Sequence, residues 1–355
     1  MNHATALADR AALLSLKLLA AGNVLFLISF LIVSALAVGQ ARAAAPVCTG
    51  QDMLAALAKD DPALLDKVAT EAGKTLNGSG LLWKLEKDGQ KPSFLFGTMH
   101  MTDPRVTRLT PAAQKSFDAS DIVVIETTDV LDQSRMMAAI TAEPELMMFT
   151  DATTLSSLLS PQDAAVVDEA LEERGIPAAS VAKMKPWMLS AMIALPACEL
   201  ARKAGGLPVL DVKLAEDAKA AGKRLEGLES AADQLRAMAS LPMEFHMKGL
   251  VETLKLGDRA DDVIETMIVL YEREDTGMFW PLFRAVLPNG GEDDASYAAF
   301  EETMITTRNR TMAERAAPVL AEGNAFLAIG ALHLPGPDGL IELFRKAGYT
   351  ISRVE

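Results

Sequence analysis

Two histidines of this chain close the same short phrase. In "FLFGTMHM" an apolar run leads to Gly97, two further residues, His100 and an apolar residue. More than two hundred residues later, "LAIGALHL" repeats the pattern through Gly330 to His333. The chain has only four histidines, so two in one repeated phrase are better explained by a shared site than by two unrelated loops. Imidazole serves as a metal ligand or as an acid–base group.

Two carboxylates stand in comparable places. Glu126 ends the β-branched run "DIVVIE", and Glu229 ends "RLEGLE". Four ligand-type side chains thus follow expected strands, and sites form at the carboxyl ends of strands in open α/β sheets. Two imidazoles with one or two carboxylates suit Mn, Co, Zn or Fe, which can activate water for hydrolysis. The plainer interpretation is hydrogen-bonded loop histidines and solvated strand-end carboxylates.

Two further polar residues favour structural interpretations. Asp211 comes just before the helical pattern "VKLAEDA", so it fits a helix N-cap. His246 lies within a helical tract and is expected to be structural. The chain contains no HExxH, GxSxG, P-loop, GxGxxG or CxxCH motif.

The hydrophobic patterns predict one α/β domain over residues 44–355. Its mixed sheet is completed by N- and C-terminal segments, and a large helical insertion occupies about 130–320. The expected strands flank the hairpin signal Asp88-Gly89, and the others cover 121–126, "LPVL", 224–229, and the strand–helix–strand ending of the chain. Helical spacing also fills residues 48–80.

Residues 1–43 differ from the rest of the chain. A basic start precedes the uncharged segment Leu18–Val38, and a small-residue site "ARA" follows. This pattern fits either a cleaved signal peptide or a retained N-terminal membrane anchor. Both place the remainder outside the cytoplasm, in the periplasm or anchored facing it. Cys48 and Cys198 then form either a disulfide or two separate buried thiols.

The charge balance excludes one class of partner. Residues 1–43 hold three of the 34 basic and one of the 48 acidic residues, so the remainder carries a net charge of −16. Such an acidic domain does not favour binding to nucleic acid. Half of the residues are hydrophobic, which is enough for a large core, while the oligomeric state stays open.

Several segments resemble the TraB/GumN family, which includes the TIKI-type proteins. "LLWKLEKDGQKPSFLFGTMHMTDPRV" is similar to that family's opening, and "RNRTMAERAAPVLAEGNAFLAIGALHLPGPDGLIELFRKAGYTISRV" to its close. Between them "KPW", "LD" and "GLESAADQ" match its middle landmarks, so the resemblance covers roughly residues 80–355. It implies a fold related to the erythromycin-esterase/ChaN-like group. It also implies an active centre of the two GxxH histidines and a strand-end Glu.

The resemblance also gives possible roles to Arg308 and Asn309. Arg308 could stabilise an oxyanion and Asn309 could orient substrate. The alternative for this pair is packing and capping at the start of a helix.

These observations together favour an exported metal-dependent hydrolase, specifically a peptidase acting on a peptide or another envelope substrate. His100, His333 and Glu126 are the expected metal ligands, and Glu229 is a further ligand or the general base. One alternative is an envelope protein that binds haem, iron or another small ligand without catalysis. The other is a catalytically silent interaction protein.

Overall fold

The computed structural model describes residues 47–257, 259–287 and 294–355. The expected signal peptide or anchor, residues 1–43, lies outside these described residues. Within them, none of the helices combines the length and apolarity needed to cross a bilayer. Residues Cys48–Glu355 form one compact unit.

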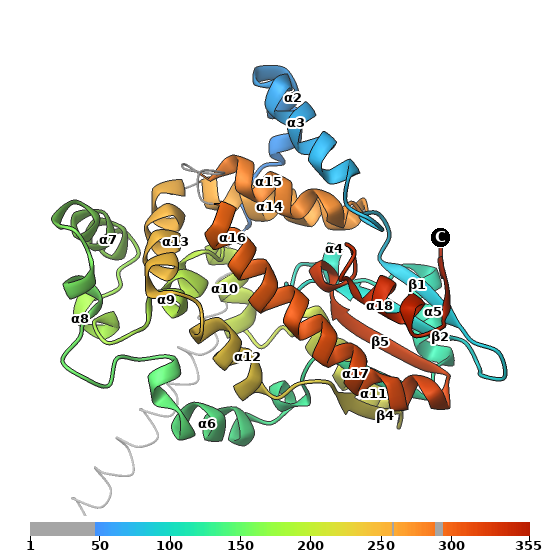
Figure 1. The fold of residues 1–355 in the computed structure, drawn as a ribbon. Helices are drawn as coiled ribbons and strands as arrows, with labels where there is room; N and C mark the ends of the chain where they lie inside the picture. The colour runs from blue at the N-terminus through green and yellow to red at the C-terminus, as the bar shows by residue number, and fades with distance from the viewer. Residues whose placement is uncertain (1–46, 258, 288–293) are drawn as a thin grey trace, which may run out of the picture. The chain divides into compact units, whose positions relative to one another are not determined.

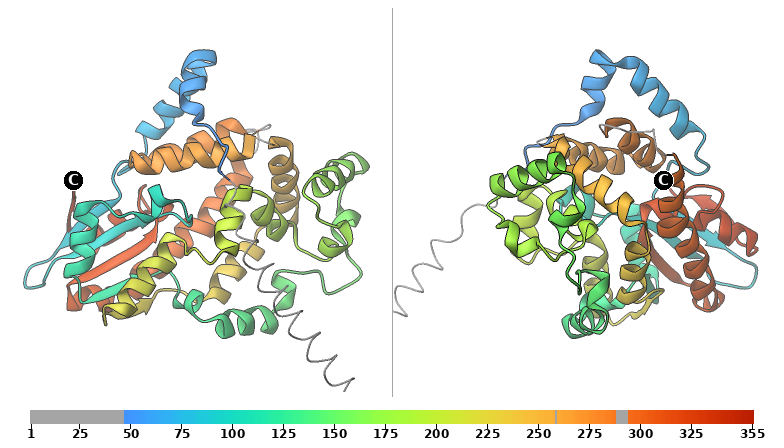
Figure 2. Two further views of the ribbon diagram at one scale, coloured as in Figure 1. Left: turned by 180° about the vertical axis from the view of Figure 1, so that it is seen from behind. Right: turned by 60° about the vertical axis from the view of Figure 1, so that its left-hand side comes forward.

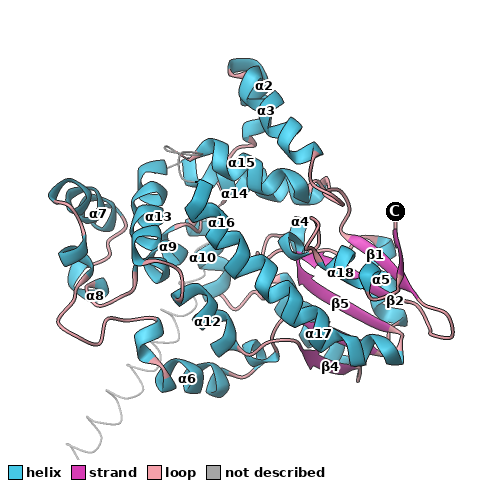
Figure 3. Cartoon of the chain, in the orientation of Figure 1, coloured by secondary structure: helices cyan, strands magenta, loops and turns pink. Residues whose placement is uncertain are grey.

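A six-stranded mixed sheet lies at one side of this unit (Figures 1 and 3). Its spatial order is β4-β3-β5-β2-β1-β6. The strands are β1 (Leu82–Glu86), β2 (Ser93–Thr98), β3 (Ile122–Ile125), β4 (Arg224–Gly227), β5 (Ala325–Gly330) and β6 (Thr350–Arg353). The four strands β4, β3, β5 and β2 are mutually parallel, whereas β1 is antiparallel to both β2 and β6. The expected mixed sheet is therefore confirmed, and its kinship to ChaN-like folds stays a prediction.

The first and last strands of the domain, β1 and β6, pair with each other at one edge of the sheet. β1 and β2 form the hairpin predicted around Asp88-Gly89, with Leu82 opposite Phe96 and Gly89 at a φ of 78°. The last strand, β6, pairs with β1 on its other side. The C-terminal strand–helix–strand unit therefore crosses over two strands, because β2 and β1 lie between β5 and β6.

Both faces of the central strands are buried, as their continuous apolar runs require. On one face Val123, Phe326 and Ala328 pack against α5 (Pro111–Ala119) and α11 (Leu210–Ala220). The ribbon seen from behind in Figure 2 shows helices lying over this face of the sheet. On the other face Val124 and Leu327 pack against α17 (Thr307–Glu322) and α18 (Leu340–Lys346). The sheet is thus the middle layer of an α/β/α sandwich.

Helices make up most of the remaining chain. Those between β3 and β4 are α6 (Gln133–Ala142), α7 (Pro161–Glu173), α8 (Ala178–Val181), α9 (Pro186–Ile193) and α10 (Ala197–Ala204). Those between β4 and α17 are α12 (Ala231–Ala239), α13 (Met243–Leu256), α14 (Arg259–Glu272), α15 (Phe279–Val286) and α16 (Asp294–Glu301). α7, α9 and α13 share a hydrophobic cluster of their own. Because β4 and α11 belong to the sheet layers, the expected insertion at 130–320 is divided into two stretches.

Two local predictions near α11 are wrong. The "LPVL" segment forms no strand; it runs unpaired into α11, which begins at Leu210. The N-cap of that helix is Val209, which makes no side-chain capping bond. Asp211 therefore lies inside the first turn, and its carboxylate is free to point toward the sheet edge.

The first two helices of the described residues lie outside the sheet and are attached to the rest of the domain by a disulfide and a hydrogen bond. Cys48 forms a disulfide with Cys198 of α10. α2 (Met53–Asp60) and α3 (Pro62–Gly73) follow, and the Met53 N–H donates to Thr266 of α14 at 2.9 Å. Of the two alternatives for the cysteines, the structure contains the disulfide.

Removing this disulfide should destabilise the domain. We expect the double variant Cys48→Ala/Cys198→Ala to lose about 2–4 kcal/mol in the free energy of unfolding, because the cross-link restricts the unfolded chain. Urea unfolding followed by circular dichroism measures the loss. Dithiothreitol should lower the midpoint of the parent protein and leave that of the double variant unchanged. Equal midpoints for parent and variant would contradict the prediction.

Candidate functional site

The four candidate ligands lie at one edge of the sheet. β2, β3, β4 and β5 are parallel, so their carboxyl ends meet there. His100 follows β2 by two residues, Glu126 directly follows β3, Glu229 follows β4 by two residues, and His333 ends the 3-10 turn η6 (Ala331–His333) after β5. The N–H of Glu229 also donates to the carbonyl of Glu126 at 2.7 Å, which ties the ends of β3 and β4 together.

The glycines of the two phrases allow the strand ends to approach closely. Gly97 pairs with Ile329 of the neighbouring strand, and a Cβ at Gly97 would lie 3.2 Å from the Cα of Ala331. A Cβ at Gly330 would lie only 2.9 Å from Oε1 of Glu126. That oxygen instead accepts the Gly330 N–H at 2.8 Å. The repeated glycine is therefore a packing requirement of this edge.

His333 is buried and held in one tautomer. The side-chain nitrogen of Asn309 donates to the carbonyl of Asp338 at 2.9 Å, so its amide oxygen faces Nδ1 of His333 at 2.7 Å. Nδ1 must then carry the proton, which leaves the lone pair of Nε2 directed at the site. The ring is 5% exposed, and burial lowers its pKa to about 4 against the opposing effect of Glu126. At neutral pH the ring is uncharged.

The ring of His100 is also held through Nδ1, but by a charged carboxylate where His333 has a neutral amide oxygen. Its Nδ1 lies 2.7 Å from Oδ2 of Asp211, whose other oxygen accepts the Thr98 hydroxyl at 2.5 Å. A carboxylate can only accept, so Nδ1 of His100 is also protonated and Nε2 faces away. The charge of Asp211 raises the pKa of His100. Because the side chain of His100 is 62% exposed, water screens part of that effect.

Glu126 is ionised although it is buried. The residue is 6% exposed, and burial alone would raise the pKa of its carboxyl group. His333, which becomes charged below about pH 4, together with His100, Arg308 and the Gly330 N–H, outweighs burial and lowers the pKa of Glu126 to about 2. Oε1 of Glu126 lies 4.0 Å from Nε2 of His333. Since that ring is neutral, this contact is not an ion pair at pH 7.

Arg308 connects the two glutamates. Its guanidinium donates to Glu126 at 2.7 Å and to both oxygens of Glu229 at 2.7–3.1 Å. The amide of Gln234 donates to the same two carboxylates at 3.0 and 3.3 Å. Arg308 lies just after the π-helical segment η5 (Glu302–Thr306), a deviation that often occurs at functional sites. Burial of two carboxylates is thus balanced by one shared cation.

The donor set fits a divalent ion by its chemistry. Two imidazole nitrogens and an ionised carboxylate are typical ligands, and hydrogen bonds from Nδ1 to Asp211 and Asn309 are the usual support of such histidines. Within the described ranges, no three His, Cys, Asp or Glu side chains are grouped closely enough to hold an ion as they stand. The arrangement supplies the ligands and their orientation, without a preassembled coordination sphere.

The structure places all six candidates from the sequence at this edge: His100, Glu126, Glu229, Arg308, Asn309 and His333. Two of them, Asn309 and Glu229, have contacts that differ from the expected ones. Asn309 is fully buried behind His333, so it contacts the ring instead of substrate. Both oxygens of Glu229 are engaged by Arg308. Asp211 and Gln234 had no functional role in the sequence interpretation. The only signal for them was their position in the family landmarks "LD" and "GLESAADQ", because helix propensity alone gave Asp211 a capping role.

Comparisons with known proteins agree with the resemblance seen in the sequence. Residues 81–353 match the model of the TraB/PrgY/gumN family. The protein named Metalloprotease TIKI1 from Danio rerio is 24% identical over 320 residues, covering 77% of this chain and 63% of the relative. Metalloprotease TIKI1 from Xenopus tropicalis is 24% identical over 319 residues, covering 77% and 61%. The chain thus spans less than two thirds of the length of these curated relatives.

The burial of neutral His333 should make stability depend on pH. Its pKa in the folded protein is about 4, below an ordinary value of about 6.5. Between these values the unfolded chain binds a proton that the folded chain does not, so stability falls as the pH drops. The parent should lose roughly 3 kcal/mol more than His333→Gln between pH 6.5 and 4, at about 1.4 kcal/mol per pKa unit. Urea unfolding in the presence of a chelator, at a series of pH values, measures this difference. Parallel curves for the two proteins would contradict it.

Proposed function

Because the chain belongs to the TraB/PrgY/gumN family, we propose that it is an exported metal-dependent hydrolase that cleaves peptides. One observation carries the proposal. His100 and His333 both have Nδ1 held by an acceptor and Nε2 left as a donor for a metal, beside an ionised glutamate. Imidazoles whose Nδ1 is held by a hydrogen-bond acceptor in this way are typical of metal centres.

The relatives support the reaction class. The zebrafish and frog proteins are both named metalloproteases, and 77% of this chain aligns with each. Nucleophilic catalysis by cysteine is not available, since both cysteines are joined in the disulfide. Hydrolysis by an activated water is therefore the chemistry that the site favours.

In this proposal His100, His333 and Glu126 hold the ion, which is Mn, Co, Zn or Fe. A bound divalent ion would polarise a carbonyl and lower the pKa of a water molecule. Asp211 and Asn309 keep the two rings in the tautomer that binds a metal. His333 is already neutral at pH 7, so no proton has to leave it before ligation.

Arg308 is the residue proposed to stabilise negative charge on the substrate. Its Nε and Nη2 protons are directed at Glu126 and Glu229, and one Nη1 proton at the carbonyl of Met304, 3.2 Å away. Among the described contacts, one Nη1 proton of the five guanidinium protons remains for a substrate oxygen. Glu229 positions this guanidinium, and it could act as a general base only if Arg308 moved away.

Export is supported by the N-terminal sequence and by the disulfide. Residues 1–43 have the composition of a signal peptide or membrane anchor. Disulfides persist in oxidising compartments such as the periplasm, and Cys48 lies only a few residues after this segment. A location in the periplasm, free or anchored, follows from the proposal.

Peptide hydrolysis should require the metal and the strand-edge residues. We expect the protein to cleave members of a peptide library in the presence of Mn²⁺ or Co²⁺, as followed by mass spectrometry. A chelator, His100→Ala or Glu126→Gln should each reduce cleavage at least about 100-fold. His246→Gln, which changes a buried histidine of α13 away from this edge, is the matched control and should retain cleavage. A metal-loaded protein that cleaves no peptide would refute the proposal.

Asp211 should tune metal affinity without being a ligand. Replacement of the carboxylate in Asp211→Asn should weaken the binding of Mn²⁺ or Co²⁺ about 10–100-fold, because the supporting hydrogen bond loses its charge. Isothermal titration calorimetry measures the affinity. The control is Asp217→Asn on the same helix, whose exposed carboxylate pairs with Lys213. Equal affinities for parent and Asp211→Asn would show that His100 does not need this support.

A further inference from the structure

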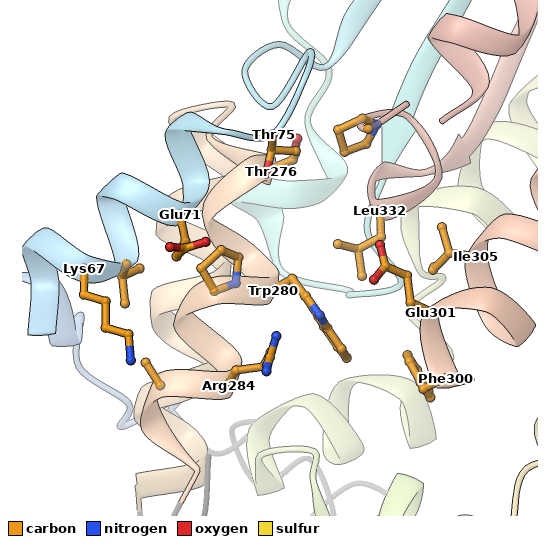
Figure 4. Close-up of a pocket in the computed structure, with 16 residues that line it drawn as sticks. Lys67, Glu71, Thr75, Thr276, Trp280, Arg284, Phe300, Glu301, Ile305 and Leu332 are labelled. Atoms are coloured by element: carbon orange, nitrogen blue, oxygen red, sulfur yellow. The ribbon is translucent and has the colours of Figure 1, made fainter. Parts of the chain in front are cut away.

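A cavity of about 580 Å³ lies next to the turn that carries His333. Figure 4 shows its walls: α3 with Lys67 and Glu71 on one side, and Ile305 and Leu332 on the other. Leu332 directly precedes His333, and Ile305 lies three residues before Arg308. Consecutive Cα atoms are about 3.8 Å apart, so the wall begins within one residue of a proposed metal ligand. Its volume is in the range of about 300–1,000 Å³ that is common for ligand pockets.

One part of the cavity wall is aromatic, within a lining that mixes apolar and polar side chains. Trp280 and Phe300 stack with ring centroids 5.5 Å apart and 8° between their planes, and both contribute to the wall. Leu332 is 39% exposed although the next residue, His333, is 5% exposed. Leu332 therefore offers an accessible apolar side chain in the cavity wall, one residue away from His333.

The charges around the cavity balance. Lys67 and Arg284 carry positive charges, and Glu71 and Glu301 carry negative charges. With no excess of either sign, the cavity offers no net attraction to an ionic group. The part of the wall formed by Trp280, Phe300, Ile305 and Leu332 instead favours an uncharged apolar group, because burial of apolar surface stabilises binding.

One wall comes from a segment that precedes the family match. α3 lies outside residues 81–353, yet the chain after it is fastened to the site turn. The Gly336 N–H donates to the carbonyl of Leu76 at 2.7 Å, and Asn77 donates to Glu342 at 2.8 Å. The N-terminal helices therefore complete a cavity whose opposite wall belongs to the proposed catalytic edge.

We propose that this cavity is a substrate subsite that takes an aromatic or large branched apolar side chain of a peptide, within a few residues of the bond that is cleaved. The inference rests on the proposed peptidase function and assigns its specificity. Leu332 and Ile305 connect the cavity wall along the chain to His333 and Arg308, and an extended peptide advances about 3.3–3.6 Å per residue, so peptide residues close to the cleaved bond would occupy the cavity.

The experiment separates binding from cleavage. The probes are fluorescein-labelled ten-residue peptides of Gly, Ser and Gln with either Phe or Ala at one central position. Fluorescence polarisation with EDTA present measures their binding, and mass spectrometry with Mn²⁺ or Co²⁺ measures their cleavage. The parent should bind the Phe peptide at least about tenfold more tightly than the Ala peptide, as expected for burying an aromatic side chain.

Two variants change the cavity in different ways. Ala285→Phe adds bulk from a half-buried position of α15, and Ile305→Ser removes an apolar contact. Both should reduce the preference for Phe to within about twofold. Ala112→Phe is the control, because Ala112 is half-buried against the same hydrophobic cluster as Ala285 but does not line the cavity. Thermal unfolding confirms that each variant is folded.

The outcomes distinguish this inference from the function on which it rests. A folded Ala285→Phe and a folded Ile305→Ser that keep the preference, or a parent without one, overturn the subsite. If peptides are cleaved and filling the cavity changes nothing, the subsite fails while the peptidase stands. If the Phe peptide is bound in the cavity-dependent manner but none is cleaved with metal, the peptidase fails while the subsite stands.

Discussion

The parallel pairing of β2 with β5 is the constraint on which the site depends. These strands are more than two hundred residues apart, and their register sets Thr98 beside Gly330. Each strand then ends in a turn that delivers a histidine to the same edge. The absence of a Cβ at Gly97 and Gly330 favours this approach, since a Cβ would lie 3.2 Å from the Cα of Ala331 and 2.9 Å from Oε1 of Glu126 respectively. The close packing of β2 against β5 therefore also brings His100 and His333 to the same edge of the sheet.

The charges at this edge form a single coupled unit. A buried, isolated carboxylate would lose several kcal/mol of hydration energy, and two of them side by side would also repel each other. Arg308 and Gln234 lie between Glu126 and Glu229 and donate to both. The two histidines have different surroundings, since His100 faces a carboxylate and solvent, whereas His333 faces a neutral amide and is buried. His333 could bind an ion as it stands, whereas His100 in its protonated form would first have to lose the proton on Nε2.

The supports of the site come from all parts of the chain. Asp211 is supplied by α11 from the middle of the sequence, and Asn309 by α17 near its end. The loop after His100 is fixed through Thr102, which donates to the buried Glu199 beside Cys198. The same cysteine anchors the N-terminal segment whose helix α3 forms one wall of the cavity. The loop after His100 and this N-terminal segment are thus both tied to α10.

The sequence alone predicted the six strands that form, the hairpin and the candidates at the strand ends, but also one strand, "LPVL", that does not form. Apolar runs, a turn signal and glycines are local features, and His100, His333, Glu126 and Glu229 stood at the predicted ends of strands. It did not identify the partners of those residues. The capping role expected for Asp211 and the substrate contact expected for Asn309 were both replaced by hydrogen bonds to histidines. These contacts join residues 111 and 24 positions apart, and no local propensity encodes them. Only the packed sheet decided which carboxylate faces an imidazole and which faces Arg308, because a buried charge takes whichever partner the tertiary structure brings within reach.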